Sequence, residues 1–199
     1  GEDKNITIID GGNSDNVITI SANYVNISHF TIRDCRNNIN NASVKITAGN
    51  AIITDNIITS PSGQHGIFVD NCDNNIIYDN TIINNGGNGI RLNHSDNNQI
   101  TYNSINSNQN GLFCYNSSNN IIQNNSAINN NDINGLFLNE TSNYNTISDN
   151  NIKSNSGNGI FLNDHCDFNT FSNNIISSNT DSGMRIENSS SNSVSNSTI

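Results

Sequence analysis

The sequence predicts an all-β protein, a single-stranded parallel β-helix of about eight coils with three short strands in each coil. Three observations carry this prediction. A unit of glycine followed by apolar, variable and apolar residues recurs every 22–24 residues. Asn, Gly, Asp and Ser interrupt short stretches of alternating apolar residues, which is typical of strands and turns. No segment has a sustained helical period. The six glycines are Gly66, Gly89, Gly111, Gly135, Gly159 and Gly183, and weaker copies lie at 18–20 and 44–46.

One repeat shows how the strands follow one another. After Asn75 we expect a first strand at 76–78, a tight corner and a second strand at 81–83. A polar turn leads to the third strand at 89–92, and the next repeat starts at Asn98. Such strands bury their apolar faces only by winding into a coil and stacking, each coil pairing with the next about 4.8 Å away.

Equivalent positions in successive coils should form columns. Asparagine amides stacked from coil to coil can bond one another and the turn backbone. A further column holds small residues that we expect to point inward. The columns are Asn56, Asn80, Asn103, Asn125, Asn150 and Asn174; Asn75, Asn98, Asn120, Asn145, Asn169 and Asn192; and Cys72, Ser95, Ser117, Ser142, Cys166 and Ser189.

The four cysteines do not fit a disulfide framework. Cys72 and Cys166 lie four coils apart, roughly 19 Å by the stacking distance. Disulfide partners need Cα atoms within about 7 Å. Cys114 takes the place of a core residue, and Cys35 lies on another column. We therefore expect four free thiols.

Composition limits the classes of function. The net charge is −10, and the seven Lys and Arg residues are scattered, so no basic face for nucleic acid is visible. No apolar run approaches the roughly 18 residues of a membrane span. Residues 1–199 form one domain. Because the chain begins and ends within the pattern, we interpret it as a fragment of a longer extracellular protein.

Two segments near the start carry a family resemblance, namely 7–12 (TIIDGG) and 25–32 (VNISHFTI). With the coils, they resemble NosD-like right-handed parallel β-helix repeat proteins of the archaeal cell-surface type, in the pectate-lyase-like fold superfamily. The resemblance spans essentially the whole chain. It implies right-handed winding and an extracellular or cell-envelope location, with which nine Asn-x-Ser/Thr sequons are compatible. The fold carries lyases, hydrolases, epimerases and non-catalytic surface proteins, so it does not define an activity.

The resemblance also implies that the sheet of third strands bears the groove of polysaccharide-active members. Side chains alternate along a strand, so one residue of each third strand points outward. Aromatic rings can contact sugars and arginines can pair with carboxylates, which suits an acidic glycan. Alternatively, the rings stack between coils, or the surface is a protein interface. The outward column is Thr19, Lys45, Phe68, Arg91, Phe113, Phe137, Phe161 and Arg185; the substrate-binding candidates are its phenylalanines and arginines.

The sequence contains only some of the residues that a catalytic site of this fold needs. Lyases of this fold use a basic residue to abstract a proton, often beside Ca²⁺ held by carboxylates. The catalytic candidates are Arg91, Arg185 and Asp70. Asp70 and Arg91 lie one coil apart and could form an ion pair on the surface. The candidate metal ligands are Asp70, Asp73 and Asp96.

Other features offer little more. The segment 64–66 (QHG) is similar to a hydrolase motif of this fold but lacks its accompanying carboxylates. His94 and His165 lie in polar turns beside aspartates, where a solvated histidine and a metal ligand are both conceivable. Turns of about five or six residues predict a flat face that holds a substrate poorly.

The favoured function is therefore a non-catalytic extracellular module, a rigid scaffold for polysaccharide or protein contact. The alternative is a lyase or hydrolase that degrades an acidic matrix glycan. A maturation factor for a periplasmic metalloenzyme is a third hypothesis, and the shortage of metal ligands argues against it. No cofactor is required, although Ca²⁺ is possible. We expect flanking domains or a homo-oligomer to cover the ends of the helix.

Overall fold

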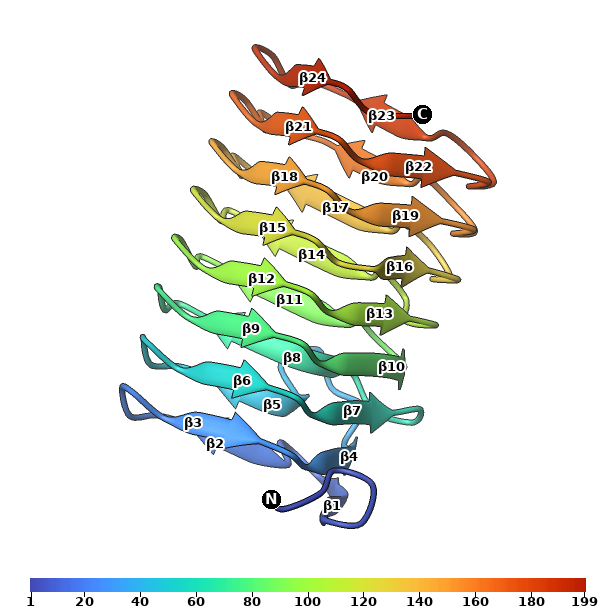
Figure 1. Cartoon of the computed structure of the whole chain (residues 1–199). Coiled ribbons are helices and arrows are strands. Elements are labelled where there is room, and N and C mark those ends of the chain that lie inside the picture. The colour runs from blue at the N-terminus through green and yellow to red at the C-terminus, as the bar shows by residue number, and fades with distance from the viewer.

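The computed structural model describes all 199 residues. The chain forms 24 strands, arranged as three parallel sheets of eight strands each. Successive strands belong to different sheets, and every third strand returns one coil further along the axis (Figure 1). The prediction of an all-β parallel β-helix with about eight coils is thus confirmed. The structure contains no helix capable of crossing a membrane.

We call the three sheets A, B and C. Sheet A contains β1 (Ile8–Ser14), β4 (Thr31–Cys35), β7 (Ile57–Ser60), β10 (Thr81–Asn85), β13 (Ser104–Asn106), β16 (Ala127–Asn129), β19 (Asn151–Lys153) and β22 (Ile175–Ser177). Sheet B contains β2 (Ile18–Ile20), β5 (Ala42–Ile46), β8 (His65–Asp70), β11 (Ile90–Asn93), β14 (Leu112–Tyr115), β17 (Leu136–Asn139), β20 (Ile160–Leu162) and β23 (Met184–Ile186). Sheet C contains β3 (Asn26–Ser28), β6 (Ile52–Thr54), β9 (Ile76–Tyr78), β12 (Gln99–Thr101), β15 (Ile121–Gln123), β18 (Thr146–Ser148), β21 (Thr170–Ser172) and β24 (Ser193–Ser195).

The core is a narrow apolar interior that runs the length of the helix. Each strand from β4 to β22 contributes one or two inward side chains, and 29 buried residues form one continuous cluster. In β11, Ile90 and Leu92 are fully buried, as the alternation predicted. Removing these side chains from water is the main favourable term, because each coil can bury them only against its neighbours.

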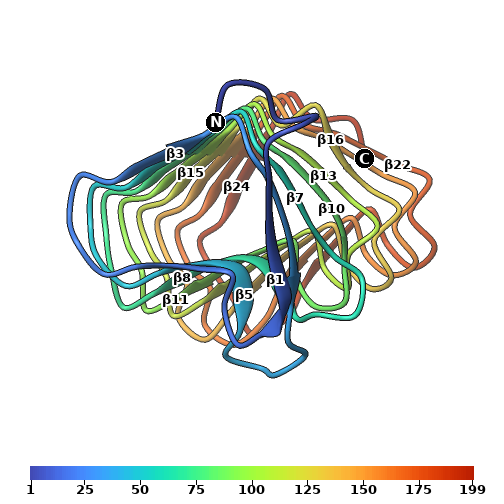
Figure 2. The same ribbon diagram turned by 90° about the horizontal axis from the view of Figure 1, so that it is seen from below.

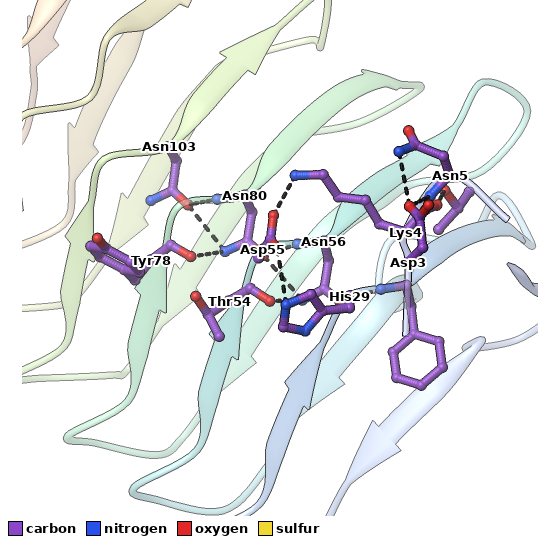
Figure 3. Close-up of polar contacts among 12 residues, drawn as sticks. Asp3, Lys4, Asn5, His29, Thr54, Asp55, Asn56, Tyr78, Asn80 and Asn103 are labelled. Carbon is purple, nitrogen blue, oxygen red and sulfur yellow. Dashed lines mark hydrogen bonds and ion pairs between the residues drawn. The ribbon is translucent and has the colours of Figure 1, made fainter. Parts of the chain in front are cut away.

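The two predicted asparagine columns are hydrogen-bonded ladders. At the corner between sheets C and A, Asn80 Nδ2 donates to Asn103 Oδ1 at 3.1 Å. Asn80 Oδ1 accepts the backbone N–H of Asn56 at 3.0 Å. These three residues lie in line in Figure 3. The amides thereby satisfy corner backbone groups that no sheet can pair, which is why buried asparagine is needed there.

Two further ladders were missed by the sequence analysis, and both line the turn between sheets A and B. In one, each Nδ2 donates toward the C-terminal coil, as when Asn85 bonds Asn108 at 2.9 Å. In the other, donation runs the opposite way, as when Asn110 bonds Asn88 at 2.9 Å. The members are Asn85, Asn108, Asn131, Asn155 and Asn179, and Asn88, Asn110, Asn134 and Asn158. The second ladder was visible in the sequence as the asparagine that precedes four of the six repeat glycines, namely Gly89, Gly111, Gly135 and Gly159.

The repeat glycine allows the chain to pass close to these ladders. A Cβ added at Gly135 would lie 2.5 Å from Ile152 Cγ2, 2.7 Å from the carbonyl oxygen of Gly159 and 2.8 Å from Asn155 Nδ2. No side chain fits there without moving backbone. The glycine period that organises the sequence is therefore a packing requirement at the start of sheet B in each coil.

All four cysteines are free and buried. Cys114 lies in the core, where burial raises the pKa of its thiol. Cys72 and Cys166 take positions in the serine column: the Cys72 N–H donates to Ser95 Oγ at 3.3 Å, and the Cys166 N–H donates to Ser189 Oγ at 3.0 Å. Such buried protonated thiols behave as small apolar residues rather than as nucleophiles.

The N-terminal segment lies across the first coil, as Figure 2 shows. Thr31 Oγ1 donates to the carbonyl oxygen of Lys4 at 2.6 Å. Lys4 and His29 both pair with Asp55 at the corner between sheets C and A, the latter at 3.2 Å (Figure 3). The contact with Lys4 holds the pKa of the Asp55 carboxyl below its ordinary value. This corner carboxylate thus attaches the N-terminal segment to the second coil.

Candidate functional site

The predicted outward column lies along sheet B. Pairing places Lys45 beside Phe68, Phe68 beside Arg91, and Arg91 beside Phe113. The same register continues through Phe137 and Phe161 to Arg185 in the following three strands. The eight positions therefore form one line along the helix axis, but its two halves differ in what the side chains do.

In the C-terminal half, the three rings of Phe113, Phe137 and Phe161 form a half-buried stack. Ring centroids are 5.0 Å apart in both pairs, with interplanar angles of 21° and 5°. The Arg185 guanidinium lies 5.2 Å from the centroid of Phe161 and covers the end of the stack. The ring faces are used against one another, so the stack presents ring edges to the outside. This arrangement supports stacking between coils, one of the alternatives left open by the sequence.

In the N-terminal half, Phe68 is buried, with 1% of its surface exposed. Lys45 Nζ lies 4.7 Å from the ring centroid, and Arg91 Cζ lies 4.8 Å from it. The His65 ring approaches edge-on at 5.5 Å. Assigning Phe68 as a substrate-binding surface residue was therefore wrong, because two cations and a histidine occupy the space that a sugar would need.

The predicted Asp70–Arg91 ion pair is also wrong. Asp70 pairs with Lys45 at 3.1 Å and accepts a hydrogen bond from Asn93 Nδ2 at 3.0 Å. Partial burial alone would raise the pKa of Asp70, but these hydrogen bonds outweigh it and leave the pKa below its ordinary value. Arg185 in β23 pairs with Glu187, which follows the end of that strand.

Arg91 is thus a cation without a carboxylate partner. Of the seven Lys and Arg residues, five pair with carboxylates, and Arg91 and Lys153 do not. Arg91 Nη1 donates to the carbonyl oxygen of Ile39 at 3.1 Å, whereas its buried Nε has no partner. Burial lowers the pKa of Arg91. A half-buried guanidinium without an anion is unfavourable, and a ligand carboxylate would relieve it.

His65 occupies the position that asparagine takes in the following coils, in the ladder that begins at Asn88 and in which each amide donates toward the N-terminal coil. Its Nδ1 accepts the backbone N–H of Asn88 at 3.1 Å, so Nε2 carries the proton and donates to the carbonyl oxygen of Ile39 at 3.1 Å. Burial, together with the charge of Arg91, lowers the pKa of His65 to about 3. The imidazole is neutral and both nitrogens are engaged, which makes it a structural group and a poor general acid or base.

A shallow groove of about 210 Å³ lies beside the stack, between sheet B and the preceding turns. It runs along the axis, with the turn 36–41 at one end and Phe137 at the other. The turn length agrees with the prediction, but the turn folds onto sheet B and projects beyond the other coils near β5 (Figure 2). The face is therefore not uniformly flat. The lining residues are Ile39, Gln64, His65, Asn88, Arg91, Gln109, Asn110, Phe113 and Phe137.

Two of the three predicted metal ligands, Asp73 and Asp96, serve the turns instead. Asp73 accepts the backbone N–H of Asp96 at 2.7 Å, and Asp96 accepts that of Ser118 at 2.7 Å. No three histidine, cysteine, aspartate or glutamate side chains lie close enough to hold a metal ion together. The structure does not bring Asp70, Asp73 and Asp96 together as one metal site.

The remaining candidates are also separated. Arg185 lies four strands from Arg91 along sheet B, roughly 19 Å at the usual strand spacing. His94 Nδ1 is bonded to the Asn116 amide at 2.9 Å, and His165 Nδ1 contacts Asp164 at 2.9 Å. Only Arg91 among the predicted catalytic residues therefore faces the groove, and it does so without an acid–base partner.

Comparison with known proteins defines the class of this chain. Residues 4–127 and 42–199 match the model of the right handed beta helix region family, and the chain belongs to that family. No curated protein matches the sequence significantly.

Two crystal structures have similar folds, a single and a double mutant of the periplasmic alginate epimerase AlgG. The first superposes with a TM-score of 0.79 at 20% identity over 90% of this chain. The second gives 0.78 at 18% identity over 92% of this chain. The chain spans 47% of the epimerase in both cases, about half of its length. At this identity the likeness concerns the fold alone.

Proposed function

We propose that this chain is a non-catalytic module of an extracellular or cell-envelope protein, and that it binds an acidic polysaccharide along sheet B. The strongest support for this proposal is the environment of Arg91. This guanidinium is half-buried, lacks a carboxylate partner and lies in a groove lined by side-chain amides. A sugar carboxylate would pair with the guanidinium while the amides of Gln64 and Gln109 bond hydroxyl groups.

The non-catalytic part of the proposal rests on the groove chemistry. Proton abstraction from a uronic acid needs a base near the reacting carbon. The buried titratable group beside the groove, His65, has both nitrogens hydrogen-bonded and a pKa of about 3. The aromatic stack then supplies an apolar edge beside the sugar, and the parallel sheets supply rigidity.

An enzyme acting on an acidic polysaccharide is the alternative. The resemblance in fold to an alginate epimerase favours it, since that protein acts on such a polymer. The test is incubation of the protein with polyuronates, with and without Ca²⁺. Unchanged chain length, no new unsaturated ends and an unchanged ratio of uronic acid epimers support the module. A change in any of the three establishes the enzyme.

Binding itself is tested by titrating the protein with a defined uronic acid oligosaccharide. Arg91→Ala should weaken binding at least tenfold, because a charge-assisted pair in a half-buried site contributes about 1.5–3 kcal/mol. The matched control is Lys153→Ala, which removes the other unpaired cation, on sheet A, and should leave affinity unchanged. Equal losses in both variants would contradict a site at Arg91 and indicate attraction by net charge.

A further inference from the structure

The groove is closed at its N-terminal end by the turn between β4 and β5. The Ile39 carbonyl accepts from Arg91 Nη1 at 3.1 Å, and the Asn40 carbonyl accepts from Lys45 Nζ at 3.3 Å. Both cations lie against Phe68, which is itself buried. The turn is thereby held against sheet B at this end of the groove, on the line that a polymer along the sheet would follow.

The other end of the groove has no such closure. There it is lined by Phe113 and Phe137, which are half-buried and belong to the stack that continues along sheet B. The turn before β14, which contributes Gln109 and Asn110, pairs with the turns of both adjacent coils: the Gln109 N–H donates to the Gly87 carbonyl at 2.8 Å, and the Gln109 carbonyl accepts from the Ile133 N–H at 2.7 Å. A bound chain could leave in this direction, with its next residues along the ring edges.

We propose that the groove recognises the terminal residue of an acidic oligosaccharide, with the carboxylate of that residue on Arg91, rather than the interior of a polymer. This inference rests on the proposed function and specifies which part of the glycan is bound. The volume agrees with it. About 210 Å³ is smaller than the roughly 300–1,000 Å³ of sites for drug-sized ligands, and fits a single sugar ring better than several.

The experiment compares uronic acid oligosaccharides of increasing length, each free or blocked with a bulky group at one end or at both. Affinity should stop rising after two or three residues. A block at one end should weaken binding at least tenfold, and a block at the other should have little effect. Affinity that keeps rising with length, or binding that survives blocking of both ends, would overturn end recognition while leaving polysaccharide binding intact. Failure of every free oligosaccharide to bind would overturn the proposed function as well.

A pair of variants locates the site independently of Arg91. Gln109→Trp should fill the groove and weaken binding of a uronic acid trisaccharide at least tenfold. Gln123→Trp places the same ring on the outer face of sheet C and should not affect binding. Unfolding curves of both variants show whether either is destabilised. If a folded Gln109→Trp protein binds the trisaccharide normally, the groove is not the site.

Discussion

The same surface of sheet B has two different organisations along its length. From β14 to β20 the coils are regular: phenylalanines stack on phenylalanines and asparagine ladders pass through without interruption. From β5 to β11 the repeat is modified, because His65 replaces a ladder asparagine, cations replace ring neighbours and a turn folds onto the face. The regular coils show what the fold requires. The modified coils show where the sequence departs from that requirement, and the groove lies at this departure.

Replacing one phenylalanine in each region should give the largest difference in stability between the modified and the regular coils. Phe68→Ala removes a fully buried ring from between two cations, and we expect a loss of about 4 kcal/mol in the free energy of unfolding. Phe137→Ala removes a half-buried ring, and we expect about 2 kcal/mol. Chemical denaturation measures both. Equal losses would show that the two rings have equivalent surroundings. A Phe137→Ala protein that keeps its stability but no longer binds glycan would refute stacking as the main role of that ring.

Substituting a ladder asparagine in the regular coils should lower the free energy of unfolding nearly as much. Asn125 is fully buried, donates to the Ile100 carbonyl at 3.0 Å and accepts the Asn103 N–H at 2.9 Å. Asn125→Ala would leave these buried groups unpaired, and we expect a loss of about 3 kcal/mol. The exposed neighbour Ser126→Ala is the control and should change stability by less than about 0.5 kcal/mol. A similar effect of both substitutions on the denaturation midpoint would argue against the ladder as a source of stability.

In the regular coils, the repeat glycine that precedes each strand of sheet B should not tolerate replacement by a residue with a side chain. Gly135→Ala places Cβ within 2.7 Å of the Gly159 carbonyl oxygen, so adjacent coils must separate locally. We expect a loss of about 2 kcal/mol or more in the free energy of unfolding. Ser156→Ala, at an exposed turn position of the next coil, serves as the reference. Wild-type stability of Gly135→Ala would show that the spacing of the coils adjusts freely.

The histidine of the modified region should make the protein sensitive to acid. The unfolded chain protonates His65 near its ordinary pKa of 6.5, whereas the folded protein keeps it neutral down to about 3. The unfolded state therefore binds the extra proton in this window, and stability falls as the pH falls below 6.5. At pH 5.5 this loss is about 1.4 kcal/mol relative to neutral pH.

His65→Asn restores the ladder residue of the regular coils and removes the titrating group. Denaturation of both proteins between pH 7.5 and pH 5 (a range above the ordinary carboxyl pKa values) isolates the histidine contribution. We expect the slope of stability against pH to be shallower in His65→Asn. Identical slopes would contradict a histidine that stays neutral in the folded protein.

The sequence by itself determined the repeat and, through it, the architecture. The period of Gly89 and its equivalents predicted the strands, and the alternation in β11 predicted which residues are buried. The columns of Asn80 and Asn75 predicted two ladders. These features could be predicted from the sequence because every coil has the same local requirement, so the same residue pattern recurs several times along the chain.

Only the tertiary structure decided the features that occur once. The burial of Phe68, the pairing of Asp70 with Lys45 and the lack of a carboxylate partner for Arg91 depend on which side chains meet across neighbouring coils. Arg91 is in addition hydrogen-bonded to the turn 36–41. That turn precedes Arg91 by about two coils in the chain and contacts it through a single carbonyl oxygen of Ile39. A periodic pattern carries no information about such a contact, because the direction in which a turn folds is set by its packing against distant residues.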